Sequence, residues 1–172
     1  MKKILVFCSL LLVAALLPLH AQRFAYVDTE YILSKMPEYQ SAQDQLNKLS
    51  EGWQAEVEGV LNEAEQLYKK YQAEKVMLSE AMQAQREEEI MRKEESAKAL
   101  QQKYFGRDGE LLRKQQELVK PIQDKVYQAV KDLSTEDGYT IVFDTAGGAN
   151  VLYANPKNDK SDAVLKKMGY SN

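Results

Sequence analysis

Few side chains in this sequence could carry out catalysis, and their positions argue against it. The only cysteine, Cys8, and the only histidine, His20, both lie within residues 1–21. This segment begins with two lysines after Met1, continues with an apolar run over 4–19 and ends at the small residue Ala21, the pattern of a cleaved secretory signal peptide. We therefore expect the mature chain to contain no thiol nucleophile, no imidazole base and no metal site built from Cys or His.

The remaining polar clusters favour structural roles. Glu87–Glu89 and Glu94–Glu95 could pair carboxylates for acid–base chemistry, but nearby basic residues favour a solvated helix face with internal ion pairs. Gly147-Gly148 lies between two predicted strands and not before a helix, so a turn is favoured over a phosphate-binding loop. Asn158–Asp162 is typical of helix capping and lacks the spacing of a calcium loop. We therefore expect no cofactor, no metal and no enzymatic activity.

The charge balance restricts the partners. The 172 residues include 23 Lys and Arg and 26 Asp and Glu, which give a net charge of −3. Cleavage of the signal peptide would remove two lysines and leave −5, unlike the basic excess typical of nucleic-acid-binding proteins. Charged residues make up 28% of the chain, whereas glycine and proline are scarce, so the composition predicts a helix-rich protein with charged faces.

A long helical segment occupies most of the chain. Its apolar residues recur at steps of three and four, which defines a coiled-coil seam with one irregular step. These residues are Tyr39, Ala42, Leu46, Leu49, Trp53, Val57, Val60, Ala64, Leu67 and Tyr71. A second seam includes Leu111, Leu118, Ile122, Val126, Val130 and Leu133. A helix of this length cannot bury its apolar stripe alone, so we expect it to fold back or to find a partner.

We expect the helix to fold back at about 75–79, where the seam becomes irregular and Ser79 is a good N-cap. Residues 38–120 would then form an antiparallel helical hairpin whose first arm is about 55–60 Å long at 1.5 Å per residue. The apolar residues at its tip are Met77, Leu78 and Met82. They could pack within the hairpin, or they could form an adaptable surface for apolar segments of another protein, since methionine repacks easily.

Three glycines in the predicted hairpin could form a hinge. Gly52 would lie within about one helical turn of Gly106 on the opposite arm, with Gly109 close by. Glycine in a helix interior costs roughly 0.5–1 kcal/mol relative to alanine, so glycines at one level would weaken both arms there. Relief of crowding beside Trp53 explains them equally well. A kink or a new helix start is expected further along, at Pro121.

The two ends of the mature chain should meet in a small body formed by residues 22–37 and 121–172. Residues 23–27, 139–143 and 151–154 have the composition of strands, and the simplest assembly joins all three in one sheet. Because these few short elements form a poor core for one chain, we expect this body to oligomerise. The residues available for that contact are Phe24, Tyr26, Ile141, Phe143, Leu152 and Tyr153.

The predicted fold is therefore mainly α-helical with a small β-containing body. The long antiparallel hairpin is an insertion in a three-strand α+β oligomerisation domain. Two short helices complete this domain, and their N-caps are expected at Asp28 or Thr29 and at Ser161 or Asp162. Gly169 should end the second of these helices.

This order of elements resembles the Skp/OmpH family of periplasmic chaperones. The resemblance covers the whole mature chain and rests on Val27-Asp28, the long charged hairpin, Val142–Asp144 with the glycine turn, Val151–Ala154 and Ser161–Lys166. It implies a homotrimer shaped like a jellyfish, in which three helical tentacles extend from a β-rich body around a cavity. It also implies an ATP-independent holdase that binds unfolded outer-membrane β-barrel proteins and prevents their aggregation before membrane insertion.

The charge of this chain departs from the family pattern. The best-known members are strongly basic, and their positive arms are linked to acidic clients and to lipopolysaccharide. Here the segment Lys69–Lys93 contains six basic and five acidic residues, so neither lipopolysaccharide nor a membrane surface is expected as a partner. The alternative function is a structural coiled-coil protein of the cell envelope that spaces or tethers other proteins. Its seam would continue as a rod without folding back.

Overall fold

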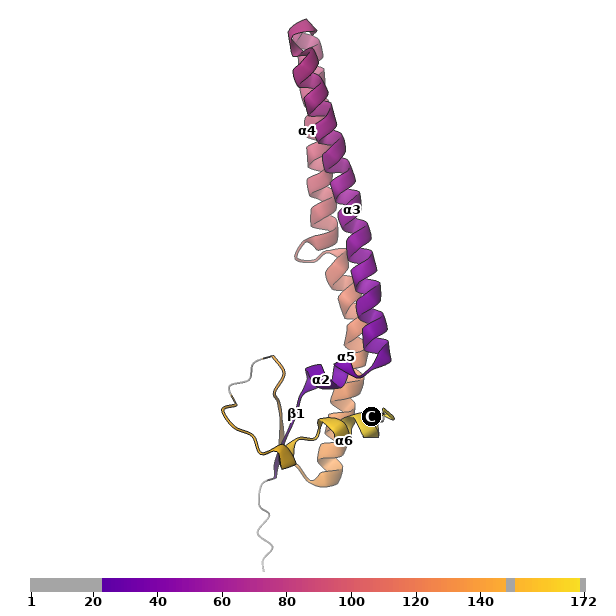
Figure 1. Ribbon diagram of the computed structural model, residues 1–172, viewed down its shortest axis with the longest axis vertical. Helices are drawn as coiled ribbons and strands as arrows, with labels where there is room; N and C mark the ends of the chain where they lie inside the picture. The colour runs from indigo at the N-terminus through magenta and orange to yellow at the C-terminus, as the bar shows by residue number, and fades with distance from the viewer. Residues whose placement is uncertain (1–22, 148–150, 171–172) are drawn as a thin grey trace, which may run out of the picture.

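The computed structural model describes residues 23–147 and 151–170, and it shows a small body from which one long helical arm extends (Figure 1). Its elements are β1 (Phe24–Val27), α2 (Thr29–Ser34), α3 (Pro37–Glu74), η1 (Lys75–Met77), α4 (Glu80–Phe105), α5 (Glu110–Asp137), β2 (Ile141–Asp144), η2 (Pro156–Asn158) and α6 (Ser161–Lys167). The predicted fold class, mainly helical with a long hairpin and a small sheet, is confirmed. The predicted signal peptide lies outside the described residues.

The body contains a two-stranded parallel sheet. β1 and β2 pair from Phe24 opposite Ile141 onwards, so segments from the two ends of the chain lie side by side. The predicted third strand over 151–154 is not formed, and the three-strand sheet is therefore wrong for a single copy of the chain. A strand needs a neighbouring edge for its backbone hydrogen bonds and a surface for its side chains, whereas here Leu152 is fully exposed.

One hydrophobic core joins the body to the base of the arm. Its largest fully buried side chains are Ile32, Met36 and Val164, which come from both ends of the chain. The other buried members are Val27, Leu33, Ala42, Leu46, Val119, Ile122, Val126, Ala129 and Leu165. Burying one large aliphatic side chain contributes roughly 1.5–3 kcal/mol, so α3 and α5 supply stabilisation that the short body elements alone could not.

A polar contact ties the two ends of the body together. Asp28 caps α2 as predicted, because its carboxylate accepts the backbone N–H of Tyr31 at 2.9 Å. The predicted cap of α6 is wrong, since the helix begins at Ser161 and its N-cap makes no side-chain hydrogen bond. The Ser161 hydroxyl instead accepts the backbone N–H of Asp28 at 2.9 Å and donates to Asp159 at 2.7 Å. This serine therefore connects α6 to the N-cap of α2.

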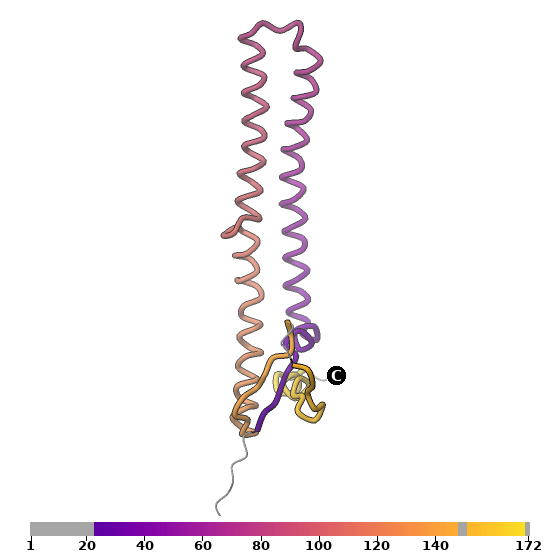
Figure 2. The backbone as a smooth tube through the Cα atoms, turned by 90° about the vertical axis from the view of Figure 1, so that its left-hand side faces the viewer, coloured from indigo at the N-terminus to yellow at the C-terminus, as the bar shows by residue number. Residues whose placement is uncertain are grey.

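The arm is an antiparallel pair in which α3 runs outward and α4 and α5 return (Figure 2). The seam predicted for α3 is confirmed, because all its residues from Tyr39 to Tyr71 are buried or half-buried and most others are exposed. The chain reverses through η1, and Ser79 caps α4 by accepting the backbone N–H of Met82.

The return helix α4 completes this seam with fewer apolar side chains. Its buried residues are Ile90, Ala97 and Tyr104, spaced seven apart. The half-buried positions between and beyond them are Gln83, Arg86, Lys93 and Leu100. Three of these four are polar, so the apolar pattern from which α3 was predicted is absent from the sequence of α4.

The return arm is interrupted at glycine. α4 ends at Phe105, the chain turns through 106–109, and α5 begins at Glu110. α5 then continues through Pro121, so the new helix start expected there is wrong. Proline removes one N–H donor from the helix, and the packing of α5 against α3 and the body outweighs that loss.

Candidate functional site

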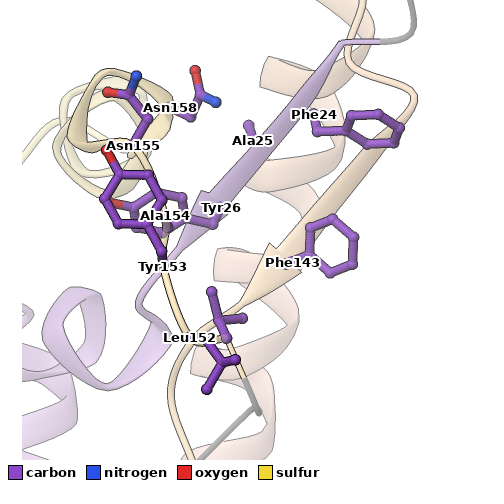
Figure 3. Close-up of a pocket in the computed structure, with 10 residues that line it drawn as sticks. Phe24, Ala25, Tyr26, Phe143, Leu152, Tyr153, Ala154, Asn155 and Asn158 are labelled. Carbon is purple, nitrogen blue, oxygen red and sulfur yellow. The ribbon is translucent and has the colours of Figure 1, made fainter.

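A largely apolar surface is exposed on the sheet of the body. Phe24 and Phe143 have ring centroids 6.4 Å apart and are 42% and 49% exposed. Beside them, Leu152 and Tyr153 are 103% and 82% exposed. With Tyr26, these four side chains line a hollow of about 640 Å³ (Figure 3). We call the six predicted contact residues Phe24, Tyr26, Ile141, Phe143, Leu152 and Tyr153 the body surface.

The structure brings the body surface together from three separate segments. Ile141 does not line the hollow but lies on the same strand as Phe143 and is 46% exposed. Tyr26 is half-buried, and this burial raises the pKa of its phenol, as do Asp159 and Tyr153. A phenol is already neutral near pH 7, so the body surface can bury Tyr26 without burying a charge.

The tip of the arm also exposes apolar side chains. Val76 and Met77 on η1 are 97% and 79% exposed, and Met82 at the start of α4 is 50% exposed. Leu78 is half-buried where the chain enters α4. Packing within the hairpin therefore buries part of the Leu78 side chain, whereas the Met77 side chain remains in contact with solvent. The sequence interpretation missed Val76, although its place within the predicted reversal could have identified it.

The three hinge candidates lie at one level of the arm. Trp53 stacks on Tyr104 with ring centroids 4.9 Å apart, which places Gly52 beside the break between α4 and α5. An added Cβ at Gly52 would meet no atom within 4 Å, so relief of crowding does not explain this glycine. A Cβ at Gly106 or Gly109 would lie only 2.3 or 2.7 Å from a backbone carbonyl oxygen of α4, so this turn requires glycine.

Tyrosine hydroxyls bind carboxylates at three levels of the arm. From tip to base, the pairs are Tyr71 with Glu87, Tyr104 with Glu56, and Tyr170 with Glu38. The hydrogen bond to Glu87 raises the pKa of Tyr71, and burial raises it further. The sequence interpretation did not identify these pairs, because each joins residues that are distant along the chain. They add polar contacts between α3 and the segments packed against it.

The first polar cluster considered for catalysis, Glu87–Glu89, has structural partners. Glu87 accepts the hydroxyl of Tyr71, Glu88 pairs with Arg92, and Glu89 pairs with Arg86. Across residues 23–147 and 151–170, no group of three or more His, Cys, Asp or Glu side chains could hold a metal ion. In the same part of the chain, every helix is too short or too polar to cross a membrane.

The molecule therefore consists of a small body with an exposed apolar surface and one long two-helix arm. Residues 23–168 match the family described as Outer membrane protein (OmpH-like), and the chain belongs to this family. It is 28% identical over 169 residues to Chaperone protein Skp of Yersinia enterocolitica, with 98% of this chain and 99% of that protein covered. The resemblance proposed from the sequence is confirmed.

A solved structure shares the fold. The crystal structure of an OmpH-like protein from Caulobacter crescentus matches with a TM-score of 0.67 and covers 86% of this chain and 84% of its own. The two sequences are 15% identical, so the fold is retained while most side chains differ. The surfaces of the present chain must therefore be interpreted from its own residues.

Proposed function

We propose that this protein is an ATP-independent holdase of the periplasm. It binds unfolded outer-membrane β-barrel proteins after export and prevents their aggregation before membrane insertion. It acts as a homotrimer in which residues 22–37 and 121–172 form the trimerisation body and residues 38–120 form the tentacle. Membership of the OmpH-like family and the predicted signal peptide over residues 1–21 support this proposal.

The observation that carries the proposal is the exposure of apolar side chains along an arm surrounded by solvent. Val76 and Met77 project from the tip, and Leu61, Tyr68 and Met91 lie on the shaft, each at least 46% exposed. A folded partner would need a continuous surface, whereas separate contacts suit a flexible chain. Each contact is weak, but several arms acting on one client raise its effective concentration and offset the entropy of confining it.

The charges of the arm favour apolar contact over electrostatic attraction. Near the tip, four basic side chains are paired with carboxylates: Lys69 with Glu65, Arg86 with Glu89, Arg92 with Glu88, and Lys93 with Glu63. Exposed ion pairs of this kind contribute about 0–1 kcal/mol each to stability, but they neutralise the field that an anionic partner would meet. The proposal therefore includes neither lipopolysaccharide nor a membrane surface.

The fold-back of the arm argues against a structural spacer. A spacer would extend the seam as a rod, whereas Trp53 in α3 stacks on Tyr104 in α4 within one chain. The reversal halves the reach of the helices (Figure 1), and it places the exposed apolar side chains Val76 and Met77 at the tip. Neither feature serves to hold two bodies at a fixed distance.

Light scattering tests the proposed function. A urea-unfolded outer-membrane β-barrel protein is diluted into buffer with and without the mature protein, and no nucleotide is added. We expect scattering to be suppressed, with saturation near three chains of this protein per client. Unchanged scattering at every salt concentration and stoichiometry would leave the fold intact but would contradict the holdase.

A further inference from the structure

The shaft of the arm has one side that exposes apolar residues. Leu61 and Tyr68 lie seven residues apart on α3, so they share a helix face, and they are 46% and 51% exposed. Met91 and Phe105 lie fourteen residues apart on α4 and are 52% and 38% exposed. A groove lined by Gln54, Val57, Glu58, Leu61, Gln101 and Phe105 joins the two helices on this side. We call Leu61, Tyr68, Met91 and Phe105 the apolar side.

The opposite side of the seam is charged and polar. Its exposed residues are also spaced seven apart: Glu56, Glu63 and Lys70 on α3, and Glu89, Ser96 and Lys103 on α4. We call these six residues the charged side. Contacts across the seam show which residues of α3 and α4 lie opposite each other on this side, since Glu63 binds Lys93 and Glu56 accepts the hydroxyl of Tyr104. Met82, seven residues before Glu89, is the apolar exception on this side.

We propose that the arm holds an unfolded segment of a β-barrel protein along its apolar side, and that the charged side faces away from the client. This inference rests on the proposed holdase function and specifies which surface performs it. A transmembrane β-strand carries an apolar side chain at every second residue, about 6.6 Å apart. Such a segment laid along the arm can bring an apolar residue to each member of the apolar side.

The extent of the apolar side favours an unfolded client over a second arm. Four half-exposed side chains present on the order of 300–400 Å² of apolar surface. A stable contact between folded proteins buries about 800 Å² on each partner, so an arm-to-arm contact here would be too small. An unfolded chain does not need a continuous surface, because its own flexibility lets it reach each apolar residue separately.

Matched cysteine variants test this assignment. The mature chain has no cysteine, so Leu61→Cys and Ser96→Cys each introduce a single thiol. These positions lie at one level of the arm on opposite sides, as do Tyr68→Cys and Glu89→Cys, because Glu63 is opposite Lys93. Each variant carries a thiol-linked photocrosslinker and is mixed with a urea-unfolded β-barrel protein. We expect a severalfold higher cross-link yield from Leu61→Cys and Tyr68→Cys.

The outcomes separate this inference from the proposed function. Equal yields from the two sides, with aggregation still suppressed, would overturn the inference alone. Failure of the unlabelled mature protein to suppress aggregation would overturn the holdase and this assignment with it. A disulfide between two copies of Leu61→Cys without client would show that arms cover each other there, and would also overturn the inference. A double variant, Leu61→Gln with Met91→Gln, should weaken client protection more than Ser96→Gln does.

Discussion

Tyr170 shows how one side chain can stabilise the base of the arm. Its hydroxyl donates to Glu38 in the first turn of α3, so a residue near the C-terminus fixes the start of the arm. This hydrogen bond lowers the pKa of Glu38, and it raises the pKa of Tyr170 to about 12, with a further contribution from burial. The contact therefore requires a charged carboxylate and a neutral phenol.

Replacing Tyr170 by phenylalanine should lower the free energy of unfolding by about 1 kcal/mol near pH 7, since one hydrogen bond to a partly solvated carboxylate is lost. The lowered pKa of Glu38 stabilises the fold above the ordinary value of 4.5, and this contribution disappears as the pH falls through the folded pKa. The raised pKa of Tyr170 stabilises the fold below 10, and this contribution disappears as the pH rises towards about 12. Urea unfolding of both proteins across this range measures the difference, and a constant difference at all pH values would contradict the assignment.

At the scale of the elements, the outgoing helix α3 and the returning arm differ in their tolerance of alanine at the level of the break between α4 and α5. Gly52→Ala should raise the free energy of unfolding by roughly 0.5–1 kcal/mol, because α3 is regular there and the added Cβ meets open space. Gly106→Ala should lower it, because its Cβ would lie 2.3 Å from a carbonyl oxygen and the turn would have to move. Thermal and urea unfolding measure whether the free energy of unfolding rises for Gly52→Ala and falls for Gly106→Ala. Equal effects from the two variants would mean that the break does not have this geometry in solution.

The hinge proposal has a clean test in Gly52→Ala, since alanine at Gly106 or Gly109 would distort the turn as well as stiffen it. If Gly52 lets α3 bend opposite the break, this variant should slow amide hydrogen exchange in α3 around Trp53. It should also narrow the range of client sizes that the protein protects. The tip variant Met77→Ala serves as a control for exchange, because it lies far from the break. Unchanged exchange and client range would show that Gly52 is not part of a hinge.

The elements that could be predicted are those whose signal is local in the sequence. The α3 seam is continuous, and Ser79 marks the reversal by its capping chemistry, so both were readable from neighbouring residues. The α4 seam could not be found, because Arg86 and Lys93 occupy seam positions whose aliphatic stems pack while their charges reach solvent. Tyr170 and Glu38 meet only after the fold has formed. Such long-range contacts leave no periodic signal.

For the whole molecule, the structure of one copy leaves the body incomplete. Its sheet has two strands, and the segment 151–154, with the composition of a third strand, lies outside the sheet with Val151, Leu152 and Tyr153 exposed. The core under the sheet is filled by α2, α3, α5 and α6, whereas the body surface, which includes Phe143 and Leu152, remains in contact with solvent. Isolated two-stranded sheets are marginal in water. These features support the proposed assembly of several copies through the body.

Phe143→Glu tests this assembly. The substitution places a charge in the body surface, where assembly would bury it without a partner, so we expect the proposed trimer to dissociate and the molar mass measured by light scattering to be that of one chain. Met82→Glu is the matched control, because Met82 is 50% exposed on the arm and Phe143 is 49% exposed on the body. The control should keep the mass of the trimer. Because one arm cannot confine a client alone, Phe143→Glu should also lose protection at equal chain concentration. A trimer of unchanged mass would show that the copies meet elsewhere.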